Sequence, residues 1–383
     1  MGVEEAVTVQ ENPLTETMSP DVLDHGRADE ALPRTLRVEL ERDRPRATPC
    51  RLSRSYRTRL VERGFHALYR WYLAQSQSKR NWNPDRDFDW AHVRKDHDPR
   101  LMNVVEGFYA VEQYAPDYGA ELTRLARRDY GRSHFYLRWA AEEERHASLW
   151  RNALLFSGAR QRNQIEDYTD ALRAKAWQPP WDDPLHMLLY TVLQERATEL
   201  IYLNLARAAR GAGSRTDVFN AVDPVLAKVA AVIAADEAAH YHFFLEAARV
   251  SLYYFPEDAL PALGDVLRGF VMPASTLVPN YDAFTADLYA GRLFGRIMYA
   301  REVVPPSLDK LSVLDRRILL RGDGTAAAKA ETGAAPITAL YQAVNREALE
   351  STVIRLFEKL GRDGRELGLA DDLLDRFVPH GWS

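Results

Sequence analysis

The segment Trp139-Ala-Ala-Glu-Glu-Glu-Arg-His-Ala-Ser-Leu-Trp150 places Glu143 and His146 three residues apart within a helical pattern. Residues at this spacing lie on the same face of a helix, and the remainder of that face is apolar. An acid and an imidazole are therefore expected to point into a core. Because a buried, unpaired carboxylate is costly, the segment needs a base or a metal ion as its partner.

The same Glu-x-x-His spacing occurs a second time, at Glu237 and His240. Two further helical patterns carry their apolar stripes onto Glu112 and Glu195, so the order of one Glu followed by Glu-x-x-His is repeated along the chain. This combination is the ligand set of ferritin-like di-iron and di-manganese carboxylate bundles. We therefore predict an all-α fold, a ferritin-like helical bundle with additional packed helices, and these metal ligands: Glu112, Glu143, His146, Glu195, Glu237 and His240.

The charges and donor atoms of this set favour two metal ions. Four carboxylates and two neutral imidazoles balance two divalent cations, whereas four carboxylates without metal would repel one another. Nitrogen and oxygen donors without thiolate suit iron or manganese better than structural zinc. The single cysteine, Cys50, excludes a disulfide within the chain and any multi-thiolate metal site.

Composition narrows the functional classes further. The 383 residues are 46% hydrophobic, enough for a substantial core, and the net charge of -5 argues against general nucleic-acid binding. We find no apolar run of the roughly 18 residues that a membrane helix needs, and the first residues lack the features of a signal peptide. The expected location is the cytoplasm.

Four parts are expected along the chain. Residues 1–48 combine prolines and charges without a sustained period and are predicted to be a disordered leader. Residues 49–321 form the predicted ferritin-like domain, in which Asp183-Pro184 and Asp223-Pro224 each read as an N-cap followed by proline at the first helical position. Residues 322–336, rich in Ala and Gly, are a predicted linker, and residues 337–383 a helical extension.

Roughly residues 50–320 resemble the soluble acyl-acyl carrier protein desaturase family. The resemblance rests on three motifs, Glu142-Glu143-Glu144-Arg145-His146, Asp236-Glu237-Ala238-Ala239-His240 and Gln194-Glu195-Arg196-Ala197-Thr198. Three positions depart from the family pattern, since Ala238-Ala239 replaces a Lys-Arg pair and Glu199 stands where an uncharged residue is expected. Glu199 could be an extra ligand, or a surface or supporting carboxylate.

The resemblance implies the arrangement of the site and its reaction. Glu112 and His146 would hold one iron ion, Glu195 and His240 the other, and two acids, Glu143 and Glu237, would bridge them. Members of this family are usually homodimers that take electrons from ferredoxin, use O2, and remove two hydrogens from an acyl chain on a carrier protein. Because carrier proteins are acidic, the basic segment from Arg51 to Arg80 is the expected docking surface, with a solvated helix face as the alternative.

Three more residues are predicted to act beside the metal ligands. Thr198 shares a helix face with Glu195 and could donate a hydrogen bond to oxygen or water, or only to its own backbone. Asp236 precedes a ligand and could orient His146, with Trp82 behind it as a route for electrons.

Two other functions remain open from the sequence. One is a related di-iron oxygenase that hydroxylates or otherwise oxidises a thioester-bound intermediate, on a carrier protein or on coenzyme A. The other is a ferritin-like iron-binding protein without an organic substrate, which the length of the chain disfavours.

Overall fold

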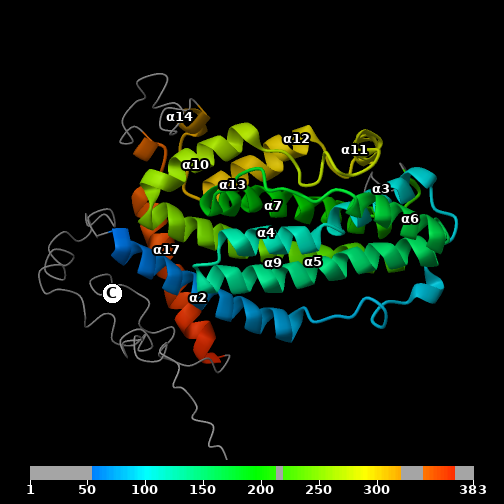
Figure 1. The fold of residues 1–383 in the computed structure, drawn as a ribbon, viewed down its shortest axis with the longest axis horizontal. Helices are drawn as coiled ribbons and strands as arrows, with labels where there is room; N and C mark the ends of the chain where they lie inside the picture. The colour runs from blue at the N-terminus through cyan, green and yellow to red at the C-terminus, as the bar shows by residue number, and fades with distance from the viewer. Residues whose placement is uncertain (1–53, 213–218, 321–339, 367–383) are drawn as a thin grey trace, which may run out of the picture.

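The structure is a computed structural model, described here for residues 54–212, 219–320 and 340–366 (Figure 1). Within these ranges the regular elements are helices, and the β-type pairing is an isolated bridge between Val313 and Val344. The predicted all-α fold is therefore confirmed. None of the helices in the described ranges is long and apolar enough to cross a membrane.

The bundle is formed by long helices that run along the longest axis of the molecule (Figure 1). α7 and α9 pack along each other, while α5 packs against α2, α3 and α4. Large aromatic and aliphatic side chains fill the space between these layers. The helices of the bundle are α2 (Arg54–Lys79), α3 (Pro99–Glu112), α4 (Ala115–Leu125), α5 (Tyr130–Phe156), α7 (Pro184–Ala209) and α9 (Pro224–Tyr254).

Both predicted Asp-Pro helix starts are present. The Asp183 carboxylate accepts hydrogen bonds from two backbone amides at the start of α7, at 3.0 and 2.8 Å. Asp223 does the same at the start of α9, at 2.7 and 3.1 Å. Each carboxylate satisfies amide groups that the first turn of a helix leaves without a partner, and each proline lacks the amide hydrogen that would need one. The two longest apolar helices therefore begin at defined residues.

Further helices surround the bundle, as predicted. α17 crosses one end of the molecule and contacts α2 and α9 (Figure 1). These helices, with two short non-α turns, are η3 (Trp90–His92), α6 (Arg162–Arg173), α10 (Pro256–Gly269), α11 (Tyr281–Ala290), α12 (Arg296–Met298), the π-helical turn η4 (Tyr299–Val303), α13 (Val304–Lys310), α14 (Arg316–Leu320) and α17 (Arg346–Glu366).

The predicted domain boundaries stay predictions. The leader, residues 1–48, and the linker, residues 322–336, lie outside the described residues. The predicted extension, residues 337–383, is described over 340–366, and that part contains α17.

Candidate metal centre

The structure brings all six predicted ligands together in the interior of the bundle. Their side chains come from α3, α5, α7 and α9, and none of the residues is more than 4% exposed. The ligand atoms form two groups, each within 4.8 Å, and Glu143 and Glu237 belong to both. The remaining members are Glu112 and His146 in one group, and Glu195 and His240 in the other. Two groups of ligand atoms that share two carboxylates would fit two metal ions.

The two histidine rings are oriented alike. His146 turns Nδ1 toward Glu143 and Glu237, at 3.1 and 3.4 Å, and Nε2 toward a carboxylate behind it, that of Asp236, at 3.3 Å. His240 turns Nδ1 toward Glu143, at 3.1 Å. A ring that donates its Nε2 hydrogen to a carboxylate keeps a lone pair on Nδ1, which is the form that binds a metal ion.

Several ligand atoms lack a hydrogen-bond partner among the described residues. Glu143 Oε1, Glu195 Oε2 and His240 Nδ1 are all buried in this state. Burial raises the pKa of the Glu112 and Glu195 carboxyls well above the usual range, and the neighbouring carboxylates raise it further. Two divalent cations would satisfy these atoms and offset the repulsion, and the nitrogen and oxygen donors suit iron or manganese. The residues therefore fit a dinuclear centre.

Three donors hold the carboxylates of the ligand set in place. Trp139 Nε1 donates to Glu195 Oε1 at 3.0 Å, and the Tyr202 hydroxyl donates to Glu112 Oε1. The Thr198 hydroxyl lies 2.8 Å from Glu237 Oε2 and 3.1 Å from the backbone carbonyl oxygen of Glu195 in the same helix. Since a hydroxyl has one hydrogen, Thr198 donates to one of these acceptors at a time. The structure is therefore compatible with both interpretations of Thr198, as a donor to an oxygen atom of the site and as a donor to its own backbone.

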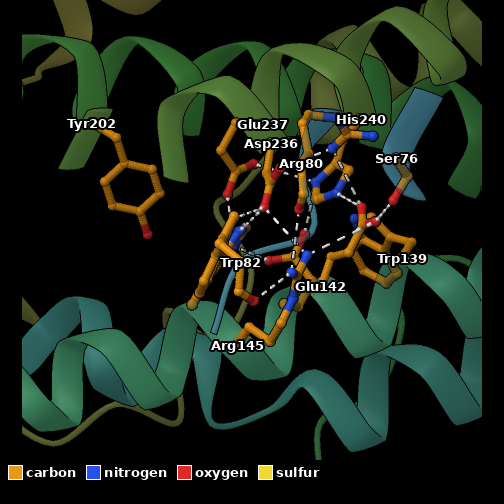
Figure 2. A network of polar contacts seen from close by, with 12 residues as sticks. Ser76, Arg80, Trp82, Trp139, Glu142, Arg145, Tyr202, Asp236, Glu237 and His240 are labelled. Carbon is orange, nitrogen blue, oxygen red and sulfur yellow. Dashed lines mark hydrogen bonds and ion pairs between the residues drawn. The ribbon is translucent and has the colours of Figure 1, made fainter. Parts of the chain in front are cut away.

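Asp236 and Trp82 lie behind His146, where the sequence places them. Trp82 Nε1 donates to Asp236 Oδ2 at 3.1 Å, and Arg80 donates to Oδ1 at 2.9 Å. The indole of Trp82 stacks on the His146 ring, with centroids 6.1 Å apart and planes 12° apart. Trp82 and Asp236 are in contact with each other (Figure 2). Both also contact His146, so the three side chains form a continuous path from a half-buried indole to a candidate ligand.

A residue missed from the sequence, Glu142, occupies the equivalent position behind His240. Its carboxylate is fully buried and accepts hydrogen bonds from His240 Nε2, at 2.9 Å, and from the Ser76 hydroxyl (Figure 2). It also accepts from Arg138 Nε, at 2.9 Å, and from the Tyr72 hydroxyl. Burial alone would raise the pKa of Glu142, but the bond and the charge of His240, and then Arg80, hold it well below the usual range.

The internal repeat contains a signal that could have found Glu142. Asp236 directly precedes Glu237, and Glu142 directly precedes Glu143 in the same way. Each backing acid supports the histidine of the other motif, Asp236 that of α5 and Glu142 that of α9. The role assigned to Asp236 could therefore have been extended to Glu142, which holds the same position in the other half of the repeat.

Two sequence interpretations change. Glu199 is paired with Arg196 at 2.6 Å and belongs to neither group of ligand atoms, so an extra ligand role has no geometric basis. The interpretation of Arg80 as part of a docking surface is wrong, because its side chain is only 13% exposed and pairs with Asp236. Arg57 is likewise buried, against Glu257. Lys79 remains exposed.

A cavity adjoins the ligand set. Three candidate ligands and Thr198 contribute to its wall, and the rest is mostly aromatic and aliphatic. The hydroxyls of Tyr118 and Tyr190 each donate to a backbone carbonyl at 2.9 Å, so both hydroxyl hydrogens already have an acceptor in the protein. The lining residues are Val111, Glu112, Tyr118, Leu122, Trp139, Glu143, Trp177, Met187, Tyr190, Thr191, Gln194, Thr198, Glu237 and Pro273.

The fold and this site define a helical bundle with a carboxylate and histidine centre of the ferritin-like type. The model of the fatty acid desaturase family matches residues 104–319, more than half of the chain. The chain therefore belongs to the fatty acid desaturase family, and the resemblance seen in the sequence is confirmed.

Two plant relatives agree with this assignment. The chain is 32% identical over 169 residues to stearoyl-[acyl-carrier-protein] 9-desaturase 6 of Arabidopsis thaliana, covering 40% of this chain and 41% of that protein. It is 33% identical over 177 residues to acyl-[acyl-carrier-protein] desaturase 6 of Oryza sativa subsp. japonica, covering 45% and 38%. The matches thus span about two fifths of these relatives. The solved structure of DesA2 from Mycobacterium tuberculosis H37Rv aligns with a TM-score of 0.43 and 18% identity, covering 66% of this chain and 98% of that one.

Proposed function

We propose that the protein is an O2-dependent di-iron desaturase that introduces a double bond into an acyl chain bound to acyl carrier protein. The observation that carries this proposal is the pair of ligand groups that share Glu143 and Glu237 beside a largely apolar cavity. A ferritin-like store for iron needs no such cavity, whereas an enzyme acting on a methylene chain does. The names of the plant relatives support the same substrate class.

The proposed reaction balances with an external electron donor. Two adjacent methylenes lose two hydrogens, and O2 takes these together with two electrons and two protons to leave as two molecules of water. Two bound iron ions would supply the oxidising chemistry that an unactivated methylene requires. A ferredoxin-type protein is the proposed source of the electrons.

The residues of this chain bind and orient the reactants. Glu112 and His146 would hold one ion and Glu195 and His240 the other. The apolar cavity would exclude water and hold the acyl chain against the ligands. Thr198 Oγ1 contributes to the cavity wall and bonds Glu237, so it is placed to hold or release a proton at that boundary.

Residues outside the cavity are proposed to pass electrons to the metal centre and to bind the carrier protein. We assign electron entry to Trp82 through Asp236 to His146, because these three side chains are in contact. The homodimer and the cytoplasmic location expected from the sequence remain part of the proposal. Exposed basic residues near the end of α2, such as Lys79, are the proposed contacts for the acidic carrier protein.

Metal analysis combined with product mass spectrometry tests this function. The iron-reconstituted protein is incubated with O2, a ferredoxin system and acyl carrier proteins bearing chains of several lengths. We expect two irons per chain and a product that has lost two hydrogens. A product that has gained one oxygen would identify a hydroxylase instead, and one zinc ion, or no metal after reconstitution, would refute the di-iron centre.

A further inference from the structure

Arg80 lies between the two carboxylates that back the candidate histidine ligands. Its Nη1 donates to Asp236 Oδ1 at 2.9 Å and lies 3.5 Å from Glu142 Oε2 (Figure 2). Asp236 in turn bonds Nε2 of His146, and Glu142 bonds Nε2 of His240. One guanidinium therefore connects, through one carboxylate each, to both histidines.

The position of this guanidinium is fixed by its surroundings. Arg80 follows the last residue of α2, and its amide continues the helical turn by donating to the Ser76 carbonyl at 3.0 Å. The guanidinium lies over the Tyr72 ring, 4.9 Å from its centroid, and the side chain is 13% exposed. Tyr72 and Ser76 themselves bond Glu142. The end of α2 thus forms a rigid support behind the ligand helices.

We propose that Arg80 is a positioning residue that ties the two backing carboxylates together, so that both metal positions depend on it. This inference rests on the proposed metal centre and adds a residue outside the ligand motifs. A buried carboxylate that loses its cationic partner is destabilised and moves toward other donors. Without Arg80, both Asp236 and Glu142 would shift, and each histidine would lose its fixed orientation.

Another arginine provides a matched control. The Arg138 side chain donates to Glu142 at 2.9 Å and to Ser76, so its bonds lie on the His240 side alone. Removing Arg138 should therefore disturb one metal position, whereas removing Arg80 should disturb both. Both substitutions delete one positive charge, so the general electrostatic effect is the same.

The experiment is a titration of the metal-free, full-length protein with Co2+, followed by the visible bands of the bound ion. Unaltered protein should take up two equivalents. Arg80→Gln should still take up two, because the ligands remain, with the affinity for both lowered by about 10–100-fold and the bands shifted. Arg138→Gln should weaken one equivalent more than the other, so that its binding curve separates into two steps. Arg80→Lys keeps the charge but not the planar fork, and should give a smaller loss than Arg80→Gln.

Any of the following results would contradict the inference. A curve for Arg80→Gln that coincides with the unaltered protein would show that Arg80 supports neither histidine, and weakening of only one equivalent would show that it serves one carboxylate. If Arg80→Gln does not fold, Arg80→Lys becomes the test. Co2+ affinities and visible bands of Arg80→Lys that match those of the unaltered protein would mean that the site does not need the guanidinium to connect the two carboxylates. A lack of Co2+ uptake by the unaltered protein would instead remove the metal centre itself.

Discussion

Replacing Glu142 by Gln tests whether the residue missed from the sequence is essential to the site. The shape of the side chain is kept, but the carboxylate, which only accepts hydrogen bonds, becomes an amide that also donates. In the structure its two oxygens face donors only, from His240, Arg138, Tyr72 and Ser76. At least one of these donors would then face the amide nitrogen and lose its partner.

The size of the effect follows from burial. Removing one partner of a buried, hydrogen-bonded ion pair costs about 3–5 kcal/mol, and Glu142 is fully buried, so solvent does not weaken the interaction. At roughly 2–4 °C per kcal/mol for a large domain, the melting temperature of the metal-free protein should fall by about 6–20 °C. Metal binding should also weaken, by about 10–100-fold, because His240 loses its fixed tautomer.

The assay is thermal unfolding followed by circular dichroism, together with a metal titration. Glu144→Gln is the control, since Glu144 lies two residues away on the same helix, is exposed, and bonds only Ser148 in the described structure, at 2.9 Å. That substitution should change stability by less than about 0.5 kcal/mol. If Glu142→Gln melts within about 2 °C of this control, the reasoning about the backing carboxylate is refuted.

Further predictions concern a ligand, the electron route and pH. His146→Ala should lower the metal content by elemental analysis, whereas His242→Ala, at a side chain 43% exposed, should not; equal losses would argue against the ligand assignment. Trp82→Phe keeps the stacked ring but loses the hydrogen bond to the backing acid, so iron should stay bound while reduction by the donor slows about tenfold or more, and unchanged kinetics would remove Trp82 from the route. Hydrogen bonding to Asp183 raises the pKa of His186, so the contribution of His186 to stability is present below about pH 6.5 and is lost at higher pH. Urea titrations should therefore show the unaltered protein losing stability relative to His186→Gln as the pH rises. Parallel curves for the two proteins would contradict this.

The grouping of the six candidate ligands could be predicted because its signals are local. The Glu-x-x-His spacing fixes which residues share a helix face, and Asp183 and Asp223 fix where two of the helices begin. The repeat of one Glu followed by Glu-x-x-His then indicates that the two halves of the chain contribute equivalent residues to one site. The spacing and the caps depend on residues no more than four apart, and the repeat is visible in the sequence itself, so all three can be read without knowing how the helices pack.

The support around the ligands could not be predicted in the same way. The Tyr202 hydroxyl bonds Glu112, which is 90 residues away in the sequence, and Arg80 bonds Asp236 at a separation of 156 residues. A run of positive charge is equally compatible with a solvated face and with buried ion pairs, and only the packing of α2 decides between them. Charge counted along the segment therefore gave the wrong role for Arg80.

The support also shows why α2 belongs to the functional unit. The family match begins at residue 104, after α2 ends, yet α2 and the residues that follow it provide Tyr72, Ser76, Arg80 and Trp82 to the backs of both histidines. The motif on α9, Asp236-Glu237-Ala238-Ala239-His240, itself carries no cation beside the buried carboxylates. The cations come instead from the end of α2 and from α5, where Arg80, Arg138 and Arg145 surround Glu142 and Asp236. Because Tyr72, Ser76 and Arg80 are partners of these buried carboxylates in addition to the arginines of α5, we expect the orientation of both histidines to depend on the packing of α2 against the ligand helices.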